Sequence, residues 1–73
     1  MEKTDWKATA KNTLKAELAR KGVDYETLAN KLNEIGVEES YNSINTKINR
    51  GTFTFQFFLQ CMKAISITNI RLD

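Results

Sequence analysis

The chain has 73 residues, 41% of them hydrophobic, and a formal net charge of +2, values typical of one small globular domain over residues 1–73. One cysteine and no histidine exclude an internal disulfide and a zinc finger, so we expect no metal and no cofactor. The longest apolar run, residues 57–59, is far shorter than the roughly 20 residues of a membrane helix. The polar start of the chain lacks the apolar stretch of a signal peptide. We therefore expect a cytoplasmic protein without membrane contact.

Two helices are expected in the first half of the chain. Asp5 can cap a helix over about residues 5–21 because its carboxylate can accept hydrogen bonds from the first turn, and Gly22 would end it. Asp24 starts a second helix, about residues 24–35, which Gly36 ends. The side chains expected on their apolar faces are Trp6, Ala10, Leu14 and Leu18 in the first helix and Leu28, Ala29, Leu32 and Ile35 in the second.

The first helix also carries a lysine stripe, defined here as Lys7, Lys11 and Lys15, which lies beside its apolar face. Residues four apart share one side of a helix, so the three lysines are neighbours. Such a stripe is typical of a solvated face, and contact with phosphate is the alternative.

Two further helices and a tail complete the chain. Ser40 is the preferred cap of a helix over about residues 40–50 that ends at Gly51, and Thr54 caps a helix over about residues 54–65. We expect residues 67–73 to form a short extended tail over the core, with a strand pairing to a second subunit as the alternative. The aromatic and sulfur side chains of the fourth helix region are interpreted as core: Phe53, Phe55, Phe57, Phe58, Cys61 and Met62, with Leu59 and Ile65 on the same apolar face.

The third helix has an unusual polar side. Ile44 and Ile48, four residues apart, define its inner side. The opposite side, called the reading face below, consists of Asn42, Asn45, Thr46 and Asn49. Asn and Thr are poorer helix formers than the residues that usually cover a solvated helix, and an Asn amide matches the N6 and N7 edge of adenine in the major groove. The pattern indicates base reading, with a plain polar surface as the alternative.

Charge around this helix is uneven. Residues 40–51 hold two basic side chains and no acidic one, which favours contact with DNA. Residues 22–40 hold Lys31 against five carboxylates, a net charge of −4, which disfavours it. Glu38 and Glu39 directly precede the helix, where carboxylates stabilise a helix start but occupy the end that would face phosphate.

From residue 23 onward the chain resembles the λ-repressor-like (XRE-type) helix-turn-helix domains. The segment 24–29 stands where that family has its cap, a phosphate-contacting residue and a Leu-Ala pair, and 48–51 resembles its Ile-Glu-Arg-Gly ending of the recognition helix. The segment 55–67 is similar to the helix that follows. The family has glutamine where Tyr25 stands, and a hydroxyl can also donate to phosphate.

A narrower resemblance is to a set of small uncharacterised bacterial proteins. They share the segments Trp6-Lys7, 14–18, 36–39, 50–53 and 58–61 in nearly the same order. This second resemblance implies the same all-α fold, a four-helix λ-repressor-like helix-turn-helix bundle, and no particular activity.

The resemblance and the reading face together predict sequence-specific binding of double-stranded DNA by a small bacterial or prophage transcription regulator, acting as a homodimer. The reading face is assigned to bases, and the residues assigned to the DNA backbone are Tyr25, Ser43, Lys47 and Arg50. The alternative is a protein-interaction module on the same fold without DNA binding. An enzyme is not expected, because the chain has no histidine and no phosphate-binding glycine loop.

Overall fold

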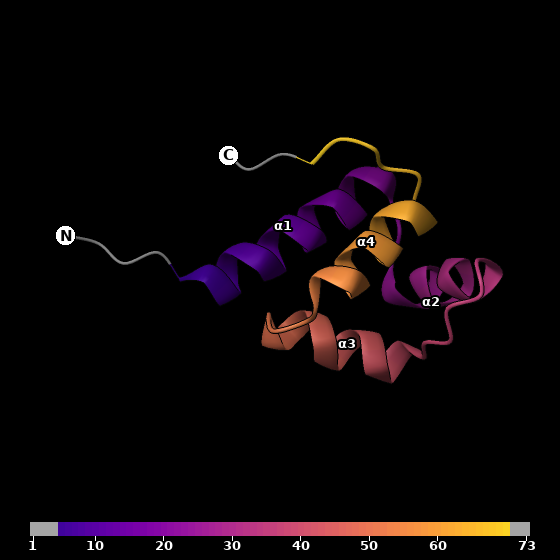
Figure 1. Cartoon of the computed structure of the whole chain (residues 1–73), viewed down its shortest axis with the longest axis horizontal. Helices are drawn as coiled ribbons and strands as arrows, with labels where there is room; N and C mark the ends of the chain where they lie inside the picture. Colours follow the sequence, from indigo (N-terminus) through magenta and orange to yellow (C-terminus); the bar gives the residue numbers. More distant parts are fainter. Residues whose placement is uncertain (1–4, 71–73) are drawn as a thin grey trace.

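A computed structural model describes residues 5–70 as four α-helices joined by short connections, with no strand in this range (Figure 1). The helices are α1 (Trp6–Lys21), α2 (Tyr25–Glu34), α3 (Tyr41–Arg50) and α4 (Phe55–Ala64). The prediction of an all-helical chain with four helices is confirmed, and each predicted range agrees with the observed helix to within one residue at either end.

The four predicted N-terminal caps are confirmed. In each case the side-chain oxygen accepts a hydrogen bond from the backbone N–H three residues later, which satisfies one of the donors that a helix start leaves unpaired. The donor–acceptor distances are 3.1 Å for Asp5 and Ala8, 2.8 Å for Asp24 and Thr27, 3.1 Å for Ser40 and Ser43, and 3.0 Å for Thr54 and Phe57.

The helices pack around one apolar core, in which α3 contacts α1 and α2, and α2 also contacts α4. The buried apolar residues are Leu14, Leu18, Leu28, Ala29, Leu32, Ile44, Ile48, Phe57, Phe58, Cys61, Met62 and Ile65. Four side chains expected in the apolar faces are exposed instead: Trp6, Ile35, Phe55 and Leu59. The spacing of these residues was correct for a helix, but no neighbouring element covers their positions.

One charged residue lies within the core. The Glu17 side chain is buried, and its carboxylate pairs with the guanidinium of Arg20, one turn along α1. Because the Arg20 side chain is half exposed, the pair connects the interior to the surface instead of leaving a buried charge alone.

The segment after α4 carries neither helix nor strand up to residue 70. Ile67 packs against the core, as expected of the tail, whereas Thr68, Asn69 and Ile70 are exposed. The remainder of the predicted tail, residues 71–73, lies outside the described residues. No helix within residues 5–70 combines the length and apolar character needed to cross a membrane.

Candidate nucleic-acid interface

The reading face lies on the side of α3 opposite the core. Ile44 and Ile48 are fully buried and fix the helix against its neighbours. The side chains of Asn42, Thr46 and Asn49 are exposed, whereas Asn45 is half-buried. Arg50, assigned to the DNA backbone, is exposed at the C-terminal end of the helix. The exposed part of α3 therefore presents amide, hydroxyl and guanidinium groups without a carboxylate.

Two members of the reading face are bonded to each other. The Asn49 amide nitrogen donates to the Asn45 side-chain oxygen at 2.8 Å. An Asn amide has two N–H donors and one carbonyl oxygen, so Asn49 keeps one N–H and its oxygen available for another partner. The half-buried Asn45 thus orients the exposed amide of Asn49.

Two residues assigned to the DNA backbone, Ser43 and Lys47, are bound to a carboxylate of the chain itself. The Ser43 hydroxyl donates to Glu39 Oε1 at 2.8 Å, and the Lys47 ammonium lies 2.6 Å from Glu39 Oε2. The same ammonium lies 4.8 Å from the centre of the Phe57 ring. This role of Glu39 was not predicted from the sequence, although residues 39, 43 and 47 are four apart and so lie along one side of α3 and the residues that precede it.

The remaining residue assigned to the DNA backbone, Tyr25, lies at the start of α2, with its ring 6.1 Å from that of Tyr41. Burial, and secondarily Tyr41, raises the pKa of the Tyr25 hydroxyl, so this group remains a protonated donor at neutral pH. Tyr25 and Tyr41 line a hollow of about 430 Å³ together with Lys15 of α1. The N-terminal cap Asp24 borders the same hollow, and the pKa of its carboxyl is lowered because the backbone N–H of Thr27 donates to it.

A second hollow, of about 240 Å³, lies at the C-terminal end of α3. Thr46, Lys47 and Arg50 line it from α3, and the segment that leads into α4 contributes Thr52 and Thr54.

Within residues 5–70, no three side chains of the types His, Cys, Asp and Glu are placed to hold a metal ion.

An apolar groove, which the sequence did not reveal, runs between the N-terminal half of α1 and the start of α4. Trp6 and Phe55 border it and are 73% and 70% exposed. The groove has a volume of about 480 Å³, and its remaining lining residues are Thr9, Ala10, Thr13, Phe53, Thr54, Phe58 and Ile70. Exposed aromatic side chains that gather in one groove are typical of interaction surfaces.

These features define a small four-helix domain with a polar, carboxylate-free helix face and a separate apolar groove. A family model described as a domain of unknown function (DUF6471) matches residues 6–70, which include all four helices, so the chain belongs to that family. The family agrees with the resemblance to small uncharacterised proteins noted above. No curated protein and no solved structure matches the chain.

Proposed function

We propose that this domain binds double-stranded DNA with α3 in the major groove, and that α2 and α3 act as a λ-repressor-like helix-turn-helix. The observation that carries the proposal is the exposed, carboxylate-free reading face of α3, which is held outward by the buried Ile44 and Ile48. The major groove is about 12 Å wide and admits one α-helix, whose short polar side chains then meet the base edges.

Within this proposal, Asn49 is the principal base-contacting residue. Its free N–H and oxygen match the N7 acceptor and N6 donor of adenine. Asn45 is a positioning residue, because it holds the Asn49 amide by the 2.8 Å hydrogen bond. Asn42 and Thr46 are exposed on the same side and would meet neighbouring bases.

The proposed assembly is a homodimer that acts as a transcription regulator. One domain of this size offers few contacts, and two copies would occupy half-sites about 34 Å apart or a multiple of it. Equilibrium sedimentation with and without duplex DNA measures whether two copies bind together.

The decisive experiment selects bound sequences from a pool of random duplexes and then measures the affinity of variants for the selected site. Asn49→Ala is expected to weaken binding by about 1–3 kcal/mol and to relax the preference at one base position, since the lost bidentate contact discriminates between bases. Asn45→Ala should weaken binding less, because Asn49 remains but loses its orientation. Fluorescence anisotropy with the selected duplex and its single-base variants measures both effects.

Asn30→Ala is the matched control, because Asn30 is an exposed asparagine on α2 outside the reading face. It should leave affinity and base preference unchanged. A selection that enriches no sequence, or an Asn49→Ala variant with unaltered preference at every position, would contradict base reading by this face.

A protein-interaction module is the second candidate function, and the apolar groove bordered by Trp6 and Phe55 is the observation that favours it. The two functions differ in their response to salt. DNA binding weakens steeply between about 50 mM and about 200 mM salt because counterions are released from the phosphates. Absence of any binding to mixed-sequence duplex at the lower concentration would favour the protein-interaction module.

A further inference from the structure

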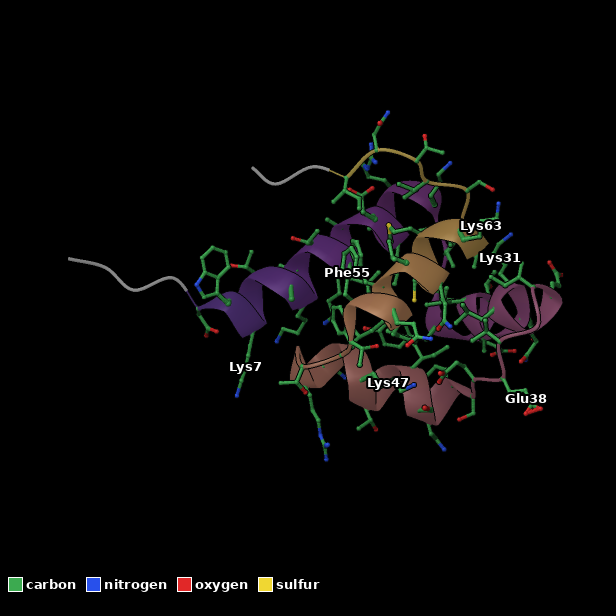
Figure 2. All side chains as sticks on the ribbon, in the orientation of Figure 1. Lys7, Lys31, Glu38, Lys47, Phe55 and Lys63 are labelled. Carbon is green, nitrogen blue, oxygen red and sulfur yellow. The ribbon has the colours of Figure 1, made fainter. Side chains whose placement is uncertain are left out.

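The lysine stripe of α1 lies near both ends of α3, and the two helices are in contact. At one end, a Cβ placed on Gly51, which ends α3, would collide with the backbone carbonyl of Lys7. At the other end, Lys15 lines the same hollow as Tyr41, the first residue of α3. Lys11 lies between them, one helical turn from each. In Figure 2 the Lys7 side chain points from α1 toward the side of the molecule where α3 lies.

Unlike Lys47, whose ammonium pairs with Glu39, two lysines of this stripe have side chains that, among the described residues, are free to bind an anion. Lys7 is exposed and Lys11 is half-buried, and within the part of the chain that the structure describes neither forms an ion pair. Asp5 is the nearest carboxylate to Lys7 along the described chain, and it already accepts the Ala8 N–H as the cap of α1.

The third lysine of the stripe has a more acidic environment. Lys15 shares its hollow with Asp24 and Glu26, so its charge is partly offset there. Lys7 and Lys11 are therefore the two members of the stripe best placed to meet an anion.

We propose that Lys7 and Lys11 bind phosphates of one DNA strand while α3 contacts the bases. This inference rests on the DNA-binding function proposed above and moves the main phosphate contact from Lys47 to α1. Packed helices have axes about 8–10 Å apart, and the backbones that border the major groove are about 12 Å apart. A helix alongside the one in the groove thus has its side chains at the level of a phosphate backbone.

The test measures the salt dependence of binding to a mixed-sequence duplex by fluorescence anisotropy. Each phosphate contact contributes about 0.9 to the slope of log K against log salt. The double variant Lys7→Gln/Lys11→Gln should make this slope shallower by about two, and it should weaken all sequences alike because phosphates carry no base identity. Lys47→Gln should change the slope little, since the Lys47 ammonium is bound to Glu39.

The matched control is Lys31→Gln/Lys63→Gln, which removes the same total charge. Figure 2 shows Lys31 and Lys63 on α2 and α4, away from the side toward which Lys7 points. This control should leave the slope within about half a unit of that of the unaltered protein, on a scale of about 0.9 for each phosphate contact. Helical circular dichroism and thermal unfolding check that all variants are folded.

Each outcome has a defined meaning. A shallower slope in the stripe variant alone supports the phosphate contact. An equal loss of slope in both double variants shows an effect of net charge and overturns it. Steep, unaltered salt dependence in both variants also overturns it but leaves the DNA-binding function standing. No binding of the unaltered protein to duplex overturns both proposals.

Discussion

On the flank of α3 that faces α4, Ser43 and Lys47 both hydrogen-bond to the Glu39 carboxylate, whereas on the flank beside α1 the side chains of Lys7 and Lys11 form no ion pair within the described residues. Both flanks carry basic side chains, Lys47 on one and Lys7 and Lys11 on the other. Only the structure distinguishes a lysine whose charge is neutralised inside the molecule from one whose charge is available to a ligand. Which lysines form a basic surface therefore depends on which of them are paired with carboxylates. The number of lysines in the sequence does not reveal this.

The largest effect is expected from Gly51→Ala, which would break the contact between α1 and α3. Gly51 has φ of +69°, and its Cβ would collide with the Lys7 carbonyl. The left-handed conformation costs about 1–2 kcal/mol for a residue with a Cβ, and overpacking adds about 1–3 kcal/mol. Urea unfolding should show a loss of about 2–5 kcal/mol.

Gly22→Ala is the control for this prediction. Gly22 ends α1 with a similar φ of +65°, but nothing lies within 4 Å of its Cβ position. Its replacement should cost only the conformational part, about 1–2 kcal/mol. Equal losses in the two variants would show that α1 and α3 do not approach closely at Gly51.

A smaller effect is expected from Glu39→Gln, which would make the α4 flank resemble the α1 flank. Removing the charge weakens the hydrogen bonds to Ser43 and Lys47, so the free energy of unfolding should fall by about 1–3 kcal/mol. The released Lys47 charge should then steepen the salt dependence of DNA binding by about 0.9 for one new phosphate contact.

Glu38→Gln removes the same charge one residue earlier. Glu38 is exposed, and in Figure 2 its side chain points away from the helices. The free energy of unfolding of this variant should differ from that of the unaltered protein by less than about 0.5 kcal/mol, as for most surface substitutions. If the two variants behave alike, Glu39 does not hold Lys47 in solution.

At neutral pH the smallest effect is that of the titration of Cys61, which is fully buried. Burial, followed by the nearby Glu39 charge, raises the pKa of the Cys61 thiol to about 12. The unfolded chain loses this proton first, so the stabilisation is present below the ordinary thiol pKa of 9.0 and is lost as the pH rises from there toward about 12.

Urea unfolding at several pH values measures this loss. Between these two pKa values the free energy of unfolding should fall by at most about 1.4 kcal/mol per pH unit from this group. Cys61→Ala should lack that component of the slope, and parallel curves for the two proteins would contradict the raised pKa. Glu39→Gln should bring the thiol pKa closer to its ordinary value, because Glu39 contributes to the shift.

The sequence predicted the four helices because local chemistry decides where they begin and end. Asp, Ser and Thr caps and left-handed glycines act within one helical turn, so their effect does not depend on the rest of the fold. The exposure of Trp6 was not predictable in this way. Helix α1 has 16 residues against 10 in α4, and Figure 1 shows its N-terminal end extending past the shorter helices.

In the candidate site, too, some features follow from local sequence and others do not. The outward direction of Asn42, Thr46 and Asn49 follows from helical periodicity once the two isoleucines are taken as the inner side, and it agrees with the structure. Lys47 pairs with Glu39 only because the Glu39 side chain, in the loop before α3, points toward it. A charge pattern along a sequence does not contain that direction.

The exposure of Trp6 also decides which spectroscopic signal can follow this protein. Trp6 is the only tryptophan, and at 73% exposure its indole is already largely surrounded by water in the folded chain. Its fluorescence should therefore change little on unfolding, and helical circular dichroism is the suitable probe of stability. A shift of its emission to shorter wavelength on mixing with another molecule would instead report that the groove beside it had been covered.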